Sequence, residues 1–504
     1  MEGRGGRTAL LTPHGACTYA DLAALTNRIG NVLLELGVRR GDRVLLALAD
    51  SVEFVATWYA AQKIGAVTAE VYTFLQPKDY AYYLNYAAPA VVVVDAMTLD
   101  RMRDAAARSS KQPILLVVGA QPEQLREREA SFEALVARGA PDLAPAPTEP
   151  DDIAIWKFTT GSTGQPKACV HPARSPHVSY EAYALGVIDF RSDDVVLPVP
   201  KLFFGYARDL TALFPFGVGA AGVIFPDRTT PDVIFDLIAR HRPSILVNVP
   251  TMMQAMLDHP KAAEQDLSCL RLCTSAGEAL PEPLHRRWQS VFGVEVLDGM
   301  GSSEAYHIFI SNRPGRVRPG SIGEAVPGYE ATVVDETGGE MHDGEVGRLW
   351  IRGGTTALMY WNDVAKSEAT FSGDLVMSGD LVERDSDGYF WYRGRADDLL
   401  KVGGIWIAPA EIERCLAAHP DVVECAVVGA EHHGLTRAAA FVVLRPGVVL
   451  SPEALQAFTR ERLAPHKVPR DLHVVAVLPK TGSGKIDRRA LRRNAAVDSG
   501  GSQS

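Results

Sequence analysis

A short polar stretch, TTGSTGQPK at residues 159–167, has the residue types of an anion-binding loop. Its glycines let backbone N–H groups approach a ligand closely, and its serine and threonine hydroxyls are further donors. The phosphate loop of NTPases needs a lysine directly after its last glycine, whereas here two residues separate Gly164 from Lys167. The stretch therefore indicates a phosphate site of another kind, although alone it is more typical of a polar strand-to-helix connection.

A second glycine-rich stretch, GMGSSE at residues 299–304, follows an apolar run that resembles a strand. Its spacing is close to a dinucleotide fingerprint, but Glu304 stands where the third glycine should be, so a Rossmann dehydrogenase is not supported. An acidic residue after such a turn suits Mg²⁺, which proteins usually bind with one or two carboxylates plus substrate phosphates. The alternative is a helix-capping Ser-x-Glu at a first turn.

Three later stretches carry further charged groups. Carboxylates and Arg395 occur in SGD at 378–380 and YRGRADD at 392–398, where they suit the paired hydroxyls of a ribose or, alternatively, form solvated turns. PKTGSGKIDR at 479–488 places Lys485 on a Gly/Ser loop that lacks the first glycine and the final Ser or Thr of an NTPase loop. Alone, Lys485 would be an ordinary exposed lysine, but five such stretches in one chain are hard to attribute to chance.

Length and composition limit the class of protein. A chain of 504 residues predicts a large domain plus at least one smaller one. Its net charge of -10 argues against nucleic acid as a partner, because phosphate backbones are bound by basic surfaces. The six cysteines show no metal-ligand pairing and are expected to be reduced thiols. Without a signal-peptide core or a bilayer-length apolar run, we expect a soluble cytoplasmic protein that does not bind membranes.

The apolar pattern predicts an α/β fold. Residues 19–37 have helical spacing after a Thr18 cap, and short apolar runs such as 43–49, 90–96 and 294–300 alternate with helix-like segments. Continuous apolar strands between helices indicate parallel sheets covered on both faces. We therefore expect a large N-terminal domain of two parallel-type α/β sheets, with a small β-rich lobe beginning near Val333.

The C-terminal part of the chain predicts a separate unit. Helix-like and strand-like runs alternate after Arg395, which indicates a small α+β domain of roughly a hundred residues. The expected organisation is an N-terminal domain at 1–395, a C-terminal domain at 396–492 and a disordered tail at 493–504.

Together these stretches resemble the adenylate-forming superfamily, which holds acyl-CoA synthetases, luciferases and peptide-synthetase adenylation domains. The chain is most similar to benzoate-CoA ligases, and the resemblance extends from about Arg7 to Arg492. Two of its stretches, HIFISNRPG and KVGGIWIAP, favour the aryl-CoA ligase branch. The most specific stretches are TTGSTGQPK, KLFFGY, GMGSSEAYHIFISNRPG, MSGD, YRGRADDLLKVGGIWIAPAEIE and LPKTGSGKIDR.

The resemblance implies a ligase that uses ATP and Mg²⁺ to convert a carboxylic acid to its adenylate. A carboxylate that attacks the α-phosphate needs charge neutralisation and in-line alignment, not a protein nucleophile. By resemblance, Glu304 holds Mg²⁺, Ser303 touches the α-phosphate, and Lys485 bridges the α-phosphate and the substrate carboxylate. The remaining nucleotide-binding residues implied by the resemblance are Thr159, Thr160, Gly161, Ser162, Thr163, Gly164 and Lys167 at the β- and γ-phosphates, Asp380 and Arg395 at the ribose, and Gly277 and Glu278.

The resemblance also implies a second step, in which a thiol attacks the adenylate after the C-terminal domain rotates. Asp397 matches the hinge, and Lys401, Gly403 and Gly404 match the thiol tunnel. The rotation would withdraw Lys485 and bring the tunnel residues toward the site. The acceptor thiol is that of CoA or, alternatively, the phosphopantetheine of a separate carrier protein; a catalytically silent nucleotide-binding protein is a third hypothesis, and the oligomer is a monomer or homodimer.

The acyl pocket implied by the resemblance contains a residue of unexpected charge. Asp209 should lie one turn from Tyr206 on a helix, and a carboxylate in a benzoyl pocket is costly unless it is paired. Its partner is either an amino or hydroxyl substituent of the substrate or an internal Arg208 or His307. The pocket residues are Phe204 at the gating position, Tyr206, Asp209, Ser275, Ala276, Gly299, Met300, Gly301, His307 and Ile308.

Overall fold

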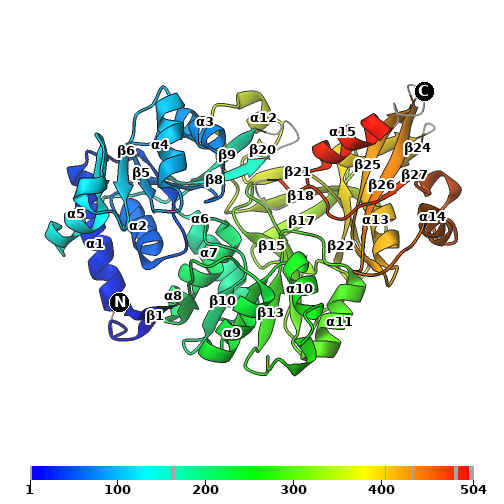
Figure 1. Ribbon diagram of the computed structural model, residues 1–504, viewed down its shortest axis with the longest axis horizontal. Helices are drawn as coiled ribbons and strands as arrows, with labels where there is room; N and C mark the ends of the chain where they lie inside the picture. The colour runs from blue at the N-terminus through cyan, green and yellow to red at the C-terminus, as the bar shows by residue number, and fades with distance from the viewer. Residues whose placement is uncertain (1–2, 161–164, 403–404, 433–434, 482–485, 499–504) are drawn as a thin grey trace. The chain divides into compact units, whose positions relative to one another are not determined.

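The computed structural model describes residues 3–160, 165–402, 405–432, 435–481 and 486–498 (Figure 1). The chain forms two compact units. Unit 1 contains Met1–Leu280, Leu284–Ala331 and Ile351–Met377, and unit 2 contains Pro281–Pro283, Thr332–Trp350 and Ser378–Ser504. Within the described ranges, none of the helices has the length and apolar character needed to cross a membrane.

The first sheet of unit 1 has eight strands in the order β19-β9-β8-β4-β3-β5-β6-β7. Its central pairs are parallel, whereas β9 pairs antiparallel with both β8 and β19. The strands are β3 (Arg43–Ala47), β4 (Val67–Glu70), β5 (Val91–Val94), β6 (Ile114–Val117), β7 (Glu129–Ser131), β8 (Ile153–Thr160), β9 (Pro166–Pro172) and β19 (Met359–Tyr360).

Both faces of this sheet are buried, as the continuous apolar runs predicted. In β3, Val44 and Leu46 belong to one hydrophobic core, while Leu45 and Ala47 belong to another on the opposite face. Helices α1 (Tyr19–Glu35), α2 (Val52–Lys63) and α5 (Phe132–Arg138) supply the first core, and α3 (Pro77–Ala87) and α4 (Leu99–Arg108) supply the second (Figure 1). The predicted Thr18 cap of α1 is confirmed as a capping box.

The second sheet of unit 1 has nine strands in the order β16-β15-β14-β13-β12-β10-β11-β1-β2. Its middle strands are parallel, and antiparallel strands close both edges. The strands are β1 (Thr8–Thr12), β2 (Gly15–Thr18), β10 (Val195–Pro198), β11 (Ala221–Val223), β12 (Ile245–Asn248), β13 (Leu272–Ser275), β14 (Val296–Gly301), β15 (Ile308–Ser311) and β16 (Glu324–Ala325). The associated helices are α6 (Ser175–Ser179), the π-helix Tyr180–Ile188, α7 (Gly205–Ala212), α8 (Phe214–Val218), α9 (Pro231–His241), α10 (Pro250–Leu257) and α11 (Glu282–Phe292).

The chain passes between the units within three strands, β17 (Tyr329–Val334), β18 (Val346–Gly353) and β21 (Leu375–Arg384). In unit 2, β21 pairs antiparallel with β22 (Phe390–Arg395), and β23 (Leu400–Val402) pairs with β24 (Ile405–Ile407). In unit 1, α12 (Val364–Glu368) and β20 (Phe371–Ser372) precede β21 in the chain, and β20 pairs antiparallel with β21.

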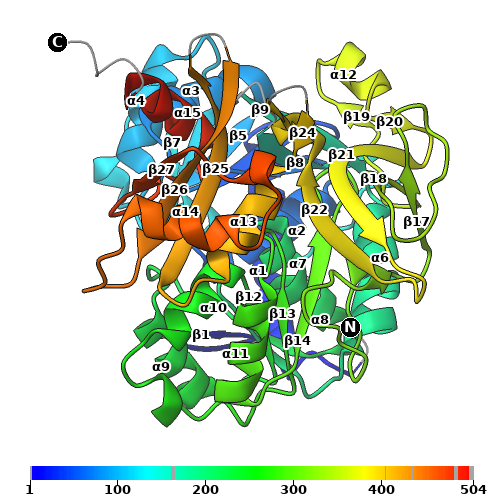
Figure 2. The same cartoon turned by 90° about the vertical axis from the view of Figure 1, so that its right-hand side faces the viewer.

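Unit 2 also contains the predicted α+β arrangement. Strands β25 (Val422–His432), β26 (Leu435–Leu444) and β27 (Asp471–Val474) form a sheet whose two faces have separate cores (Figure 2). Helices α13 (Pro409–Ala417) and α14 (Pro452–Arg460) cover one face, and α15 (Arg488–Asp498) covers the other.

The predicted start of the disordered tail, residue 493, is too early in the chain. The chain was expected to lose order at residue 493, but α15 continues to Asp498 because Leu491 and Ala495 are buried against the sheet.

Candidate active site

The first predicted loop connects two antiparallel strands. β8 ends at Thr160 and β9 begins at Pro166, with Thr159 opposite Lys167 in the register. The expectation of a strand-to-helix connection is therefore wrong, because the chain turns back along its own sheet. The predicted phosphate-binding residues Gly161, Ser162, Thr163 and Gly164 lie outside the described residues.

Lys167, the last residue of this stretch, is held in place by a carboxylate of unit 1. Its Nζ lies 2.6 Å from Asp363 Oδ2 and 5.6 Å from the centre of the Tyr360 ring. The ion pair lowers the pKa of Asp363 through the hydrogen bond from Lys167. An exposed fraction of 19% for the lysine side chain leaves it accessible to a second anion.

The second predicted stretch contains the end of β14 and the first residues of its connection to the antiparallel strand β15. No helix follows Glu304 in this described part of the chain, so the helix-capping alternative is wrong. Gly301 is required by a close approach of the backbone, because a Cβ there would lie 2.5 Å from the His307 carbonyl oxygen.

Side chains from distant strands hold this segment at the Ser303 backbone and at the Glu304 side chain. His171 Nε2 lies 2.6 Å from the Ser303 carbonyl oxygen. Burial lowers the pKa of His171 to about 3, so its ring is neutral and donates through Nε2. The Tyr360 hydroxyl donates to Glu304 Oε1 at 2.8 Å, which orients that carboxylate.

Two more donors fix the next residues of the same segment. Thr355 Oγ1 donates to the Ala305 carbonyl oxygen at 2.8 Å, and Lys157 Nζ donates to the Tyr306 carbonyl oxygen. Tyr306 has φ +71°, the left-handed region that is costly for a residue with a bulky side chain. The segment from Ser303 to Tyr306 is therefore held at each residue by a hydrogen bond from another strand or loop.

Glu304 fits the donor type that Mg²⁺ prefers, but it does so as a single carboxylate. Among the residues with described positions, no three or more His, Cys, Asp or Glu side chains cluster as metal ligands. A single carboxylate suits Mg²⁺ when substrate phosphates and water supply the other oxygens.

Two of the predicted acyl-pocket residues, Tyr206 and His307, lie against each other at α7. Tyr206 and Asp209 lie one turn apart on this helix, as expected. The Tyr206 hydroxyl lies 2.6 Å from Thr274 Oγ1, and the Tyr206 and His307 rings lie 5.8 Å apart. Ser275, at the end of β13, and Ile308, at the start of β15, are both buried. Of the other predicted pocket residues, Phe204 is the N-cap of α7, Ala276 follows β13, and Gly299, Met300 and Gly301 end β14.

The structure decides between the two partners considered for Asp209. Its Oδ1 accepts from Arg208 Nε at 2.8 Å, and its Oδ2 lies 3.2 Å from Lys157 Nζ. Although burial opposes its charge, Arg208 and Lys157 lower the pKa of Asp209. The inference of a substrate amino or hydroxyl group from Asp209 is therefore wrong, because the fully buried carboxylate has two protein cations.

Lys157 was missed in the sequence. It is a lysine within the apolar run IAIWKF, and its side chain is only 8% exposed. A charged residue in the middle of a buried strand is the signal that could have found it. Glu70, at the end of the apolar β4, gives the same signal, and it pairs with Arg208.

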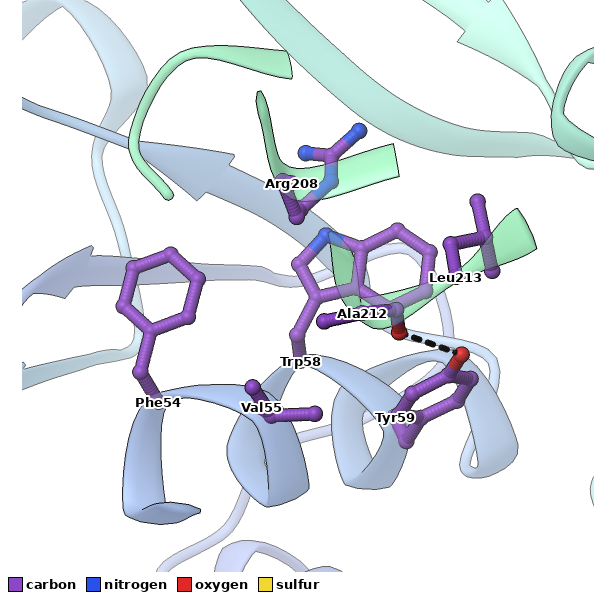
Figure 3. Close-up of a pocket in the computed structure, with 7 residues that line it drawn as sticks. All are labelled: Phe54, Val55, Trp58, Tyr59, Arg208, Ala212 and Leu213. Atoms are coloured by element: carbon purple, nitrogen blue, oxygen red, sulfur yellow. Dashed lines mark hydrogen bonds between the residues drawn. The ribbon is translucent and has the colours of Figure 1, made fainter. Parts of the chain in front are cut away.

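A small cavity between α2 and α7 is distinct from the predicted acyl pocket. Figure 3 shows the Arg208 guanidinium near the Trp58 ring, and their separation is 4.8 Å. The Tyr59 hydroxyl donates to the Ala212 carbonyl oxygen at 2.8 Å and closes one side. None of the predicted substrate-binding residues lines this cavity, whose lining consists of Phe54, Val55, Trp58, Tyr59, Arg208, Ala212 and Leu213.

Two other predicted nucleotide-binding residues of unit 1, Gly277 and Glu278, follow β13. Gly277 has φ +87°, and Glu278 Oε2 accepts from Thr251 Oγ1 at 2.5 Å and from its backbone N–H at 3.1 Å. The pair therefore forms an exposed turn anchored on α10.

Unit 2 brings the predicted ribose residues together. Asp380 and Arg395 are opposite each other in the β21–β22 register, and Arg395 Nη1 lies 3.1 Å from Asp380 Oδ1. Ser378 Oγ donates to the other oxygen of Asp380 at 2.5 Å. The predicted hinge residue Asp397 lies in a 3₁₀ turn, 3.6 Å from Arg395 Nη2.

The remaining predicted residues are at the tunnel and at the catalytic lysine. Lys401 lies in β23, opposite Trp406. Gly403, Gly404 and Lys485 lie outside the described residues, so their predicted roles stay predictions.

Comparison with known proteins identifies the class that this fold and site define. The family model of the AMP-binding enzymes matches residues 1–361, and the model of the AMP-binding enzyme C-terminal domain matches residues 411–485. The chain therefore belongs to the AMP-binding enzyme family, as the resemblance predicted.

Among individual relatives, the chain is 41% identical over 498 residues to the benzoate–CoA ligase of Thauera aromatica, covering 98% of this chain and 93% of that one. Among solved structures, an anthranilate CoA ligase in complex with anthranoyl-AMP has a TM-score of 0.94 at 36% identity, covering 99% and 96% of the two chains. A benzoate CoA ligase from Burkholderia xenovorans LB400 has a TM-score of 0.89 at 39% identity, covering 97% of each chain.

Proposed function

We propose that this enzyme activates an aryl carboxylic acid of the benzoate type with ATP and then transfers the aryl group to CoA. The first step forms the aryl-adenylate and releases pyrophosphate, and the second forms the thioester and releases AMP. The observation that supports this proposal most strongly is similarity over almost the whole chain to benzoate and anthranilate CoA ligases. The same similarity favours CoA over a carrier protein, and an active enzyme over a silent nucleotide-binding protein.

In the first step, the residues of unit 1 would neutralise and align the reactants. Lys167 would exchange its Asp363 partner for the terminal phosphates of ATP, because its partly exposed Nζ can pair with either anion. Ser303 would contact the α-phosphate from a backbone already fixed by His171. Glu304 would hold Mg²⁺, which would neutralise phosphate charge. Pre-aligned groups of this kind lower the barrier because they need little reorganisation during the reaction.

The acyl group would occupy the space beside α7. Tyr206 and His307 present aromatic faces that suit a benzoyl ring. Burial lowers the pKa of His307 to about 3, so this wall is uncharged at neutral pH. Asp209 does not contribute a free carboxylate to the pocket, so other pocket residues would contact any substituents on the ring of the substrate.

The second step would use the C-terminal domain. We propose a domain boundary between residues 395 and 396, since the turn at Ala396–Asp398 separates β22 from β23, and a C-terminal domain that continues through α15 to residue 498. Rotation about Asp397 would remove Lys485 after adenylation and present Lys401, Gly403 and Gly404 to the thiol. Asp380 and Arg395 would keep the ribose in place on the near side of this hinge.

Pyrophosphate release with Mg-ATP tests this function. The substrates to compare are benzoate, its amino and hydroxy derivatives, and a medium-chain fatty acid. We expect release that depends on an aryl acid and exceeds that with the fatty acid at least about tenfold, the equivalent of 1.4 kcal/mol. Release that is equal for the fatty acid, or absent with every aryl acid, would contradict an aryl substrate.

A further inference from the structure

Two residues of α7 and two residues of the neighbouring strands β4 and β8 form a neutral cluster of four buried charges. Arg208 pairs with both Glu70 and Asp209, and Lys157 pairs with Asp209. The exposed fractions of the four side chains range from 0% to 8%. Because such clusters are often no more stabilising than apolar residues of the same volume, the presence of this one is not by itself evidence of a stabilising role.

Lys157 connects this cluster to the segment that carries Ser303 and Glu304. Its Nζ donates to the Tyr306 carbonyl oxygen and lies 3.6 Å from the centre of the Tyr306 ring. Arg208 Nη2 lies 3.4 Å from the Tyr306 hydroxyl. Three contacts thus hold Tyr306 in a left-handed conformation, which is strained for a residue with a bulky side chain and persists only where the surroundings impose it.

Lys157 is also next to the two other parts of the predicted site, the phosphate loop after β8 and the acyl pocket at α7. It lies two residues before Thr159 on β8, the strand that leads into the predicted phosphate loop. On α7, a Cβ at Gly205 would lie 2.5 Å from Lys157 Nζ, so glycine leaves the space that the lysine occupies. Gly205 precedes Tyr206 of the predicted acyl pocket.

We propose that Lys157 is a positioning residue for adenylation, which holds the Ser303–His307 segment against α7 and thereby sets the separation of the acyl-pocket walls. The proposal rests on the proposed function and extends it, because it assigns specificity for the aryl acid to a side chain that does not itself contact the acid. Its partners in this role are Tyr306 and Asp209.

The test replaces Lys157 with methionine, which keeps the length of the side chain and removes its charge and donors. Lys201→Met is a matched control. Lys201 also lies 3.6 Å from an aromatic ring, that of Phe225, donates to the carbonyl oxygen of the same residue at 2.8 Å, and faces a carboxylate, Asp50, at 3.9 Å. It therefore controls for the loss of a buried lysine elsewhere in unit 1.

Kinetics of pyrophosphate release should separate the two variants. In Lys157→Met we expect kcat/KM for benzoate to fall about 10- to 100-fold, mainly through a higher KM, because the walls of the acyl pocket are no longer held at the separation that binds the acid. The KM for ATP should change less than about threefold, and Lys201→Met should resemble the wild type in both constants. Equal effects in the two variants, or an unchanged KM for benzoate in Lys157→Met, would overturn the proposal.

Amide hydrogen exchange gives a readout that does not depend on the reaction. Exchange in the Ser303–His307 segment should become faster in Lys157→Met than in Lys201→Met, since the segment loses a hydrogen bond to a buried cation. Unchanged exchange would overturn the positioning role even if activity falls. If exchange is faster in Lys157→Met but the wild-type enzyme shows no aryl-dependent pyrophosphate release, the proposed function would be wrong and the positioning role would stand.

Discussion

Replacing Arg208 with methionine should destabilise the enzyme strongly, because two buried carboxylates would lose their shared cation. Arg208 is 3% exposed in its side chain, and its partners Glu70 and Asp209 are 4% and 0% exposed. Asp209 would keep Lys157, whereas Glu70 would lose the guanidinium that it contacts. Removal of one partner from a buried pair costs about 3–5 kcal/mol, so we expect a loss of that size in the free energy of unfolding at pH 7.

The pH dependence distinguishes an electrostatic loss from a packing defect. A buried carboxylate without a cation binds a proton more readily in the folded variant than in the unfolded chain, so acid favours the folded state. The deficit should therefore shrink by about 1.4 kcal/mol per pH unit, or roughly 2.7 kcal/mol between pH 7 and pH 5.

Urea unfolding followed by tryptophan fluorescence measures this loss, since Trp58 lies against Arg208. The double variant Arg208→Met/Glu70→Gln is the control, because it removes the uncompensated carboxylate along with the cation. It should recover most of the lost stability and show no extra dependence on pH. A deficit in Arg208→Met that is the same at pH 5 and pH 7, or that persists in the double variant, would refute the reasoning.

Three further variants test the site. Burial lowers the pKa of His171 from 6.5 to about 3, so the unfolded chain binds a proton before the folded one, and the free energy of unfolding falls as the pH drops from about 6.5 toward 3. Urea unfolding of His171→Gln should lack this contribution to the pH dependence, which is about 1.4 kcal/mol per pH unit. Glu304→Gln keeps an acceptor for Tyr360 but should raise the Mg²⁺ concentration for half-maximal pyrophosphate release at least about tenfold, and an unchanged value would exclude Glu304 as a ligand. Lys485→Ala should lose most adenylation yet still convert presynthesised aryl-adenylate with CoA, and equal loss in both steps would contradict two conformations.

The sequence was sufficient to predict the elements of the fold because each carries a local signal. The run RVLLALA at 43–49 gives β3, and both of its faces are buried as continuous apolar strands require. The Thr18 cap gave the start of α1 for the same reason, since a capping box involves residues only three apart. The residue at which order ends was harder to predict, because α15 is ordered by contacts with a sheet that is distant in the sequence.

The contacts that build the site were less predictable, because they join segments that are far apart in the chain. The polar types of Ser303 and Glu304 marked them as candidates, but their anchors His171 and Tyr360 lie on other strands. Asp209 was recognised as a buried acid in need of a partner, and Arg208 was correctly considered. Its second partner, Lys157, is 52 residues away and becomes a neighbour only when β8 and α7 pack.

The most direct test of the central claim is the product balance of a complete reaction with Mg-ATP, benzoate and CoA. Chromatography with mass detection would quantify AMP, pyrophosphate and benzoyl-CoA over time. The account predicts one AMP and one pyrophosphate for each benzoyl-CoA, with no thioester when ATP is omitted. Production of ADP and phosphate, or of AMP and pyrophosphate without thioester in the presence of CoA, would contradict it.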